Sequence, residues 1–228
     1  MPLLPTRLIP ILVTALVAGA CSPGTQQGAQ PGPTPSQPRT GAPVDAGVAK
    51  AQADSARLPW TEADARFMTT MIGHHAQAIV MARLAPTHGA SPAVQRLAER
   101  VINAQLDEIG TMQRWLHDRR LPVPEADATR AGMTHAHGHE LMPGMLTEEQ
   151  MKQLDQARGA EFDRLFLTFM IQHHRGAVTM VEQLFGTYGA GQDETVFKFA
   201  SDVNVDQTTE IDRMEEMLAT LILERGSQ

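Results

Sequence analysis

An internal repeat is the feature that most constrains the fold of this chain. Residues 62–81 align with residues 161–180 at an offset of 99, and ten of the twenty aligned positions are identical. The centre of the first copy, Met71-Ile72-Gly73-His74-His75, returns as Met170-Ile171-Gln172-His173-His174. Such a repeat means that one structural unit is used twice, and that each unit carries the same methionine and histidine set.

Each copy predicts a helical hairpin. Thr61 is the expected N-cap of a first helix, and Ser91-Pro92 begins a second one. Apolar residues recur at spacings of three and four along both. The match of Val94 to Leu116 with the second half has an offset of 102, so the second interhelix loop is three residues longer. The expected helices span residues 62–85, 91–117, 147–158, 161–185 and 193–224.

The two hairpins predict an all-α fold. Each has one apolar face, and the faces become buried when the hairpins pack on each other, which makes a four-helix bundle. We expect the bundle domain to cover residues 58–225, with repeat one at 61–117 and repeat two at 160–224. The central connection holds a loop at 124–146 and a short extra helix, for which Thr147 and Gln150 form a capping box.

The N-terminal segment has the features of an export signal. Residues 1–20 contain an apolar stretch that is too short for a permanent membrane helix and ends in Ala18-Gly19-Ala20. The small residues before Cys21 resemble a bacterial lipoprotein signal, in which Cys21 is lipidated; plain secretion is the alternative. Residues 22–57 are rich in Pro, Gly, Gln, Ala and Ser and predict a disordered tether. We therefore expect a lipoprotein of the bacterial cell envelope.

Composition and missing motifs exclude several classes of function. A net charge of −7 without a basic stripe argues against nucleic-acid binding. A single cysteine allows neither an intramolecular disulfide nor a cysteine-based zinc site. The chain has no Glu-x-x-His, which di-iron carboxylate bundles require, and no visible nucleophile with a base. We expect a protein that is not an enzyme; a ferritin-like redox enzyme is the alternative.

The repeated methionines and histidines indicate metal binding. Met71 precedes His74 by three residues and His75 by four, so a helix brings the thioether and the imidazoles to one face. Thioethers are soft ligands and imidazoles are borderline ones, and together they favour copper, above all Cu(I), over calcium, magnesium or manganese. In the other interpretation Met71 fills the core and the histidines bond to neighbours. Packing alone does not require the same set in both halves, which favours the metal.

Two repeat-equivalent glutamines interrupt otherwise apolar stripes. They are Gln105 and Gln207, on the second helix of each hairpin. A buried amide needs hydrogen-bond partners, so we expect these side chains to bond to His74 or His173 and to orient the rings behind a metal. A partly exposed edge of the stripe is the alternative.

The same two helices carry another matched pair of residues. Glu108 and Met112 align with Glu210 and Met214 at the offset of 102. We expect the two glutamates to face solvent and the two methionines to lie in the core. Ligation of a metal by either type of side chain is the alternative interpretation.

The loop before the second repeat has an unusual composition. Its histidines alternate with other residues, and methionines flank them on both sides. Short His-rich tracts are typical of metal binding, so we expect a flexible tract that collects the metal held by the bundle; an ordinary polar loop is the alternative. The candidate ligands here are Met133, His135, His137, His139, Met142 and Met145.

The doubled motif resembles a known family. Phe-x-x-x-Met-Ile-x-His-His-x-x-Ala-(Ile/Val)-x-Met, with Met142-Pro143-Gly144-Met145 before its second copy, is similar to the bacterial domain-of-unknown-function family three hundred and five, over about residues 58–223. The similarity to its periplasmic copper-binding members implies a ferritin-like four-helix fold, an envelope location and binding of copper or silver. By motif position the resemblance implies that the ligands are Met71, His74, His75, Met81, Met170, His173, His174 and Met180.

One functional hypothesis joins these features. The protein is expected to be envelope-anchored and to bind Cu(I), with Ag(I) as a chemical surrogate, for copper buffering, tolerance or delivery. Its expected partners are the metal ion, the membrane through the lipid anchor, and an envelope copper exporter or chaperone. A structural or interaction lipoprotein, whose histidines only fill the core, is the further alternative. The sequence predicts no oligomeric state.

Overall fold

The structure of the protein is a computed structural model that describes residues 60–126 and 141–226. The expected signal segment, Cys21, the tether at 22–57 and part of the His-rich loop fall outside these ranges. In the described part of the chain no helix is long and apolar enough to cross a membrane. The candidate ligands outside the described residues are Met133, His135, His137 and His139.

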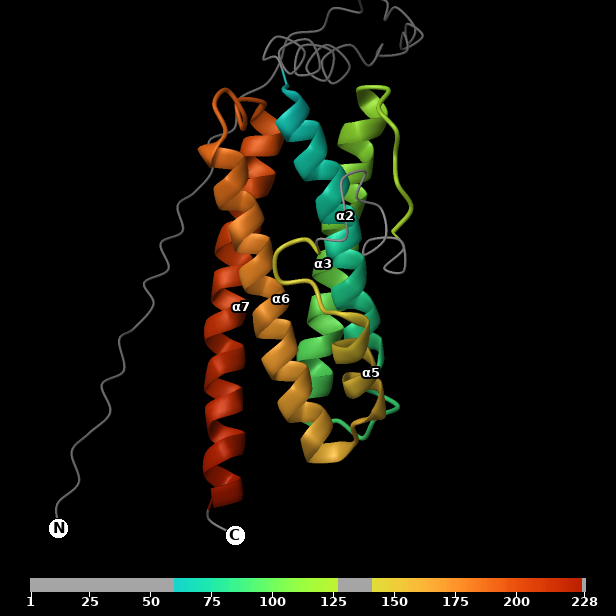
Figure 1. The fold of residues 1–228 in the computed structure, drawn as a ribbon, viewed down its shortest axis with the longest axis vertical. Helices are drawn as coiled ribbons and strands as arrows, with labels where there is room; N and C mark the ends of the chain where they lie inside the picture. Colours follow the sequence, from blue (N-terminus) through green and yellow to red (C-terminus); the bar gives the residue numbers. More distant parts are fainter. Residues whose placement is uncertain (1–59, 127–140, 227–228) are drawn as a thin grey trace, which may run out of the picture. The chain divides into compact units, whose positions relative to one another are not determined.

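Five helices account for most of the described residues (Figure 1). They are α2 (Glu62–Arg83), α3 (Pro92–Asp118), α5 (Glu148–Gln156), α6 (Gly159–Gly186) and α7 (Glu194–Gly226). All the helix ends lie within two residues of their predicted positions, and the all-α fold is confirmed. α2 packs on α3, α6 packs on α7, and the two hairpins meet mainly through α2 and α6. These two central helices run in opposite directions (Figure 1).

Local signals set the starts of three helices. Thr61 begins α2 with a capping box, in which its hydroxyl accepts from the N–H of Asp64 while the Asp64 carboxylate accepts from the N–H of Thr61. Ser91 caps α3, and Thr147 forms a second capping box with Gln150 at the start of α5. Each cap satisfies N–H groups that have no partner within the helix, so these boundaries follow from local sequence.

Two repeat-equivalent aspartates tie the hairpins together. Asp64 on α2 is buried and accepts at 2.7 Å from the backbone N–H of Gly191, between α6 and α7. Asp163 on α6 is also buried and accepts at 3.1 and 3.2 Å from the N–H of Ser91, between α2 and α3. A buried carboxylate needs such donors. Because the repeat relates the two contacts, each hairpin holds the other's interhelix loop in an equivalent way.

Two clusters of buried hydrophobic residues form the core, and the methionines are divided unequally between them. We call the cluster that contains Phe67 and Val196 the first core cluster. The second core cluster contains Phe162 and Phe166. The buried methionines of the first are Met68, Met71, Met112, Met142, Met145 and Met180, and those of the second are Met81, Met170 and Met214. The predicted core positions of Met112 and Met214 agree with this arrangement.

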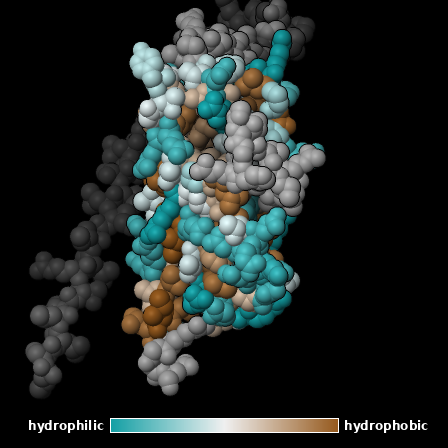
Figure 2. Space-filling view, viewed as in Figure 1, coloured by the Kyte–Doolittle hydropathy of each residue, from teal (hydrophilic) through white to brown (hydrophobic). Residues whose placement is uncertain are grey.

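The face of the bundle shown in Figure 2 is mostly polar. Hydrophobic side chains gather at its lower left, over the C-terminal end of α7. Ile222 and Leu223 are exposed in this part of α7. The end of α3 corresponds to residue 220 at the offset of 102, so these two residues lie in an extension of α7 that has no counterpart in the first hairpin.

Candidate metal centre

Four histidines form a row through the middle of the bundle. His74 on α2 and His173 on α6 stack with their ring centroids 3.9 Å apart and their planes inclined by 38°. His75 lies beside His74, and His174 lies beside His173, each with a centroid distance of 6.3 Å. All four side chains are fully buried. Since His74 and His173 are repeat-equivalent, the two copies of the motif meet at this stacked pair.

A glutamate contacts each outer histidine of the row. Glu108 Oε2 on α3 lies 2.6 Å from His75 Nε2, although the two atoms are not aligned as a hydrogen bond. Glu210 Oε2 on α7 is hydrogen-bonded to His174 Nε2 at 2.7 Å. The prediction that both glutamates face solvent is therefore wrong, because each side chain is only 17% or 23% exposed and is directed at a buried imidazole.

The inner histidine of α2 is held by the connection between the hairpins. His74 Nε2 donates to the backbone carbonyl of Pro143 at 3.0 Å. A carbonyl oxygen only accepts hydrogen bonds, so the neutral His74 ring carries its proton on Nε2. Its Nδ1 then has a lone pair, and this atom has no hydrogen-bond partner among the described residues.

The same tautomer is favoured at the two outer histidines. The carboxylates of Glu108 and Glu210 attract a proton to the Nε2 atoms of His75 and His174, since ionised carboxylates only accept hydrogen bonds. The Nδ1 atoms of both rings lack a hydrogen-bond partner within residues 60–126 and 141–226. In metal sites an oxygen acceptor on one ring nitrogen typically orients the histidine and leaves the other nitrogen to bind. Three of the four histidines have this arrangement.

Burial keeps the two stacked histidines neutral. Loss of water, together with the nearby His75, lowers the pKa of His74 to about 3. The pKa of His173 is also lowered well below its ordinary value, first by burial and then by the adjacent His74. The described residues provide no hydrogen bond of good geometry to either nitrogen of His173, although the backbone of His74 is close enough to oppose the shift slightly. A buried neutral imidazole without partners is an available ligand.

The turn that carries Pro143 is packed directly onto α6. Gly144 has a φ of +73°, which favours glycine. A Cβ atom added at Gly176 of α6 would lie only 2.0 Å from the Pro143 carbonyl oxygen. Gln77 of α2 fixes the next part of the turn, because its amide accepts from the N–H of Leu146 at 2.7 Å and donates to the Leu146 carbonyl at 3.0 Å. These contacts fix the position of the Pro143 carbonyl, which accepts the hydrogen bond from His74 Nε2.

Part of the predicted flexible tract is therefore ordered. Met142 and Met145, on either side of the turn, are 9% and 4% exposed and belong to the first core cluster. The prediction of flexibility is wrong for these two residues, because the turn lies between α2 and α6 and its side chains fill the core. Whether they ligate a metal stays a prediction, as it does for the candidates outside the described residues.

All four methionines implied by the resemblance are buried, and they are distributed in mixed pairs. Met71 and Met180 share the first core cluster, whereas Met81 and Met170 share the second. Each cluster thus combines a methionine that precedes the histidines on one helix with a methionine that follows them on the other. No three His, Cys, Asp or Glu side chains of the described residues are grouped so as to hold a metal ion. Nitrogen and oxygen ligands alone do not build a site in this part of the chain.

The two glutamines do not make the predicted bonds to histidine. Gln105 and Gln207 are buried, at 1% and 3% exposure. Within the described ranges neither amide atom of Gln105 has a hydrogen-bond partner, and the Oε1 atom of Gln207 has none. The Pro143 carbonyl, and not Gln105, accepts from the Nε2 atom of His74. Buried amide atoms without partners are rare. The unpaired atoms of these two glutamines are therefore further polar groups that a bound ligand could contact.

The sequence interpretation missed the oxygen atoms that hold the histidines. A signal for the glutamates existed, because Glu108 and Glu210 are matched by the repeat just as the histidines are. No sequence signal identifies the Pro143 carbonyl, since any residue supplies a backbone carbonyl. The two hydrogen bonds between Gln77 and Leu146 likewise join residues 69 positions apart. At such a separation the sequence spacing does not predict which residues are in contact.

Comparisons with known proteins identify similar sequences and structures. The model of the family described as "Domain of unknown function (DUF305)" matches residues 64–218. A DUF305 putative secreted protein from Streptomyces coelicolor is 30% identical, with a TM-score of 0.59 over 70% of this chain and 93% of that one. A DUF305 fragment from Deinococcus radiodurans is 26% identical, with a TM-score of 0.59 over 71% of this chain and 99% of that one.

A further similar structure is that of a copper-bound protein. CopM in its Cu(II)-bound form is 30% identical to this chain, with a TM-score of 0.55 over 69% of this chain and 96% of CopM. CopM structures in a Cu(I)-bound form and an Ag-bound form also match. A sequence comparison with curated proteins found no match.

Proposed function

Because the chain belongs to the family described as "Domain of unknown function (DUF305)", we propose that it is a copper-binding protein of the bacterial envelope. It binds Cu(I), with Ag(I) as a surrogate, through methionine and histidine side chains of the bundle. Its role is to buffer copper, to confer tolerance to it or to deliver it, and not to catalyse a reaction. An envelope copper exporter or chaperone is the partner that such delivery requires.

The orientation of the histidines is the observation that carries this proposal. His74, His75 and His174 each have an oxygen atom at Nε2 and no described hydrogen-bond partner at Nδ1. Unsatisfied buried nitrogens cost free energy in the metal-free chain, and a metal ion would remove that cost. The residues present therefore fit a bound metal.

The donor set favours a soft metal. Met71 and Met170 each precede the two histidines of their helix by three and four residues. Both methionine side chains are fully buried. Thioethers select Cu(I), whereas calcium, magnesium and manganese prefer oxygen ligands. The carboxylates of Glu108 and Glu210 are directed at histidines, which does not support the di-iron alternative. The Cu(I)-bound and Ag-bound forms of CopM agree with this choice of metal.

Silver titration of the full chain tests the proposal. A ligand that binds only the folded state stabilises it by about 2.7 kcal/mol at a hundredfold excess over its Kd, so Ag(I) should raise the Tm clearly. Mg(II) and Zn(II) should raise it less. In the double variant Met71→Leu and Met170→Leu the free energy of unfolding without metal should fall by less than about 1.5 kcal/mol, since volume is nearly kept. Its silver-induced rise in Tm should be largely lost.

The repeat supplies a matched control for this variant. Met112→Leu and Met214→Leu change two other fully buried, repeat-equivalent methionines on α3 and α7. This control should keep the silver response of the natural chain. If the Met71 and Met170 variant also keeps the full silver-induced rise in Tm, these methionines are core residues. The metal site would then have to be assigned to the 133–145 segment.

The envelope location is proposed to depend on Cys21. The similarity to a putative secreted protein supports export, and the residues before Cys21 resemble a lipoprotein signal. Lipidation of this cysteine is the membrane attachment in our proposal. Cys21→Ala should therefore move the protein from the membrane fraction to the soluble envelope fraction, measured by fractionation and immunoblotting, whereas Ser22→Ala should not. A Cys21→Ala protein that stays in the membrane fraction would mean that another anchor holds it.

A further inference from the structure

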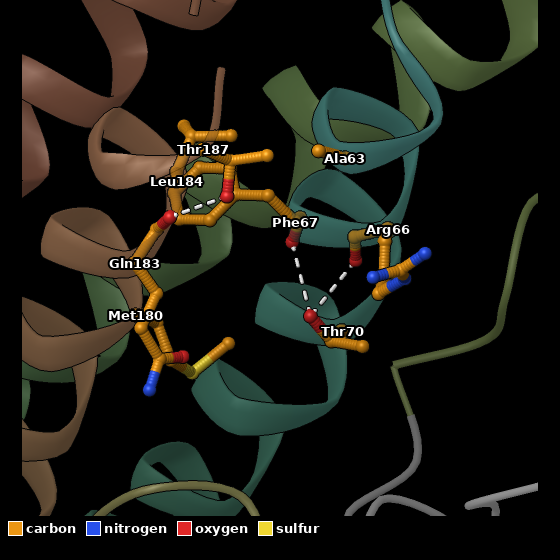
Figure 3. A pocket seen from close by; sticks show the side chains of 8 residues that line it. All are labelled: Ala63, Arg66, Phe67, Thr70, Met180, Gln183, Leu184 and Thr187. Atoms are coloured by element: carbon orange, nitrogen blue, oxygen red, sulfur yellow. Dashed lines mark hydrogen bonds between the residues drawn. The ribbon is translucent and has the colours of Figure 1, made fainter. Parts of the chain in front are cut away.

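A pocket opens at one end of the contact between α2 and α6 (Figure 3). Its volume is about 130 Å³. This is space for several water molecules, each of which needs roughly 15 Å³. α2 contributes Ala63, Phe67 and Thr70, and Met180 lines the pocket from α6. One of the candidate soft ligands is thus next to a hollow at the surface.

The Met180 thioether is the distinctive group of this pocket. It reaches from α6 toward α2, while the guanidinium of Arg66 points away from it (Figure 3). Thr70 Oγ1 donates to the carbonyl of Arg66 at 2.8 Å, and Thr187 Oγ1 donates to that of Gln183 at 2.7 Å. Both hydroxyl protons are therefore used by backbone carbonyl groups of α2 and α6. Met180 is 7% exposed, whereas Met81, its repeat equivalent, is completely buried.

The repeat-equivalent positions on α6 carry larger side chains than those at the pocket. At the offset of 99, Ala63 corresponds to Phe162 and Thr70 corresponds to Phe169. Phe162 and Phe169 are 0% and 7% exposed members of the second core cluster. Two small side chains at the pocket thus correspond to two buried aromatic rings in the core cluster that contains Met81.

The two core clusters differ in the same way. In the first, three methionines keep some exposure: Met142 at 9%, Met145 at 4% and Met180 at 7%. The buried methionines of the second have no exposure at all. The first core cluster also contains Met71, which precedes His74 by three residues. The first core cluster therefore combines partly exposed methionines with Met71, whereas the buried methionines of the second are all inaccessible from the surface.

We propose that the Met180 pocket is the port through which a soft monovalent cation reaches the buried ligands, and that the bundle loads from this end alone. The proposal rests on the function proposed above and adds the route and its direction. The cation exchanges water for the Met180 thioether and then passes to Met71 and the adjacent histidines. The aromatic side chains Phe162 and Phe169 close the equivalent route in the second repeat.

The proposal is tested by replacing a small side chain of the pocket with the larger one found at the repeat-equivalent position. Thr70→Phe puts into the pocket the side chain that stands at the matching position 169. In stopped-flow mixing of Ag(I) with the full chain, this variant should bind at least about tenfold more slowly, because the ion must then wait for local opening of the bundle. The silver stoichiometry should stay unchanged. Thr69→Phe is the control, since it adds the same bulk at an exposed neighbouring position and should bind at the natural rate.

A second measurement follows access to Met180 without any metal. Hydrogen peroxide oxidises methionine to its sulfoxide, and exposure decides which thioether reacts. Mass spectrometry of the metal-free chain should show Met180 oxidised before Met81, and Thr70→Phe should protect Met180. This readout remains informative if Thr70→Phe changes stability, because the order of Met180 and Met81 is measured in the natural chain.

The possible results distinguish a failure of the port proposal from a failure of the proposed function. Slow silver binding by Thr70→Phe with early oxidation of Met180 supports the port. Natural binding rates in Thr70→Phe, or equal oxidation of Met180 and Met81, overturn the port while the proposed function stands. A natural chain that binds no Ag(I) overturns both.

Discussion

Gly176→Ala is expected to destabilise the bundle strongly, although alanine is the better helix former. Gly176 lies inside α6, where alanine is favoured over glycine by about 1 kcal/mol. The added Cβ would lie 2.0 Å from the carbonyl oxygen and 2.4 Å from the carbonyl carbon of Pro143. Both are backbone atoms, so the clash is relieved only by moving the turn or the helix. Overpacking of this kind typically costs about 1–3 kcal/mol and occasionally more, so we expect a net loss near the upper limit.

The measurement is the free energy of unfolding from chemical denaturation. Gly110→Ala is the matched control, because Gly110 lies inside α3 and a Cβ there would meet only the flexible end of the Arg114 side chain at 3.3 Å. That control should be neutral or gain up to about 1 kcal/mol. If Gly176→Ala were as stable as Gly110→Ala, the Pro143 turn would not pack on α6, and the carbonyl would not be fixed for His74.

The fold could be predicted because its determinants are local or repeated. Thr61, Ser91 and Thr147 mark helix starts by capping groups within three residues. The pairing of the hairpins followed from the repeat, since two equivalent units with one apolar face each bury those faces together. Tertiary contacts did not have to be known for either inference.

The arrangement of the site was less predictable because its contacts are long-range. The bond from His74 to Pro143 spans 69 positions, and the bond from His174 to Glu210 spans 36. Sequence periodicity places a side chain on a helix face, but it does not tell which of several acceptors that side chain will meet. For this reason Gln105 was expected to bond to a histidine and Glu108 to face solvent, and both expectations were wrong.

The free energy of unfolding of the metal-free chain should fall steeply in acid, because two buried histidines resist protonation. Their pKa values are lowered in the folded state, to about 3 for His74 and well below the ordinary value for His173. In the unfolded chain both titrate near the ordinary value of about 6.5. As the pH falls below this ordinary value, the unfolded state takes up protons that the folded state does not.

The sign and size of the effect follow from proton linkage. Stability is unaffected by these groups above the unfolded pKa and decreases as the pH falls below it, by about 1.4 kcal/mol per pH unit for each histidine. His74 alone then costs about 3 kcal/mol at pH 4.5 relative to neutral pH, and His173 adds a loss of the same sign. Total stabilities are about 5–15 kcal/mol, so we expect a large fraction of the stability to be lost in moderate acid.

A histidine variant isolates this effect from the titration of carboxylates. His173→Leu removes one buried titrating ring that has no hydrogen bond of good geometry within the described residues. Its free energy of unfolding should fall less steeply than that of the natural chain as the pH decreases below about 6.5. His117→Gln is the control, because the His117 side chain is 83% exposed and the slope should stay natural. An unchanged slope in His173→Leu would mean that the ring is protonated inside the folded bundle, and that its burial does not keep it neutral for a metal.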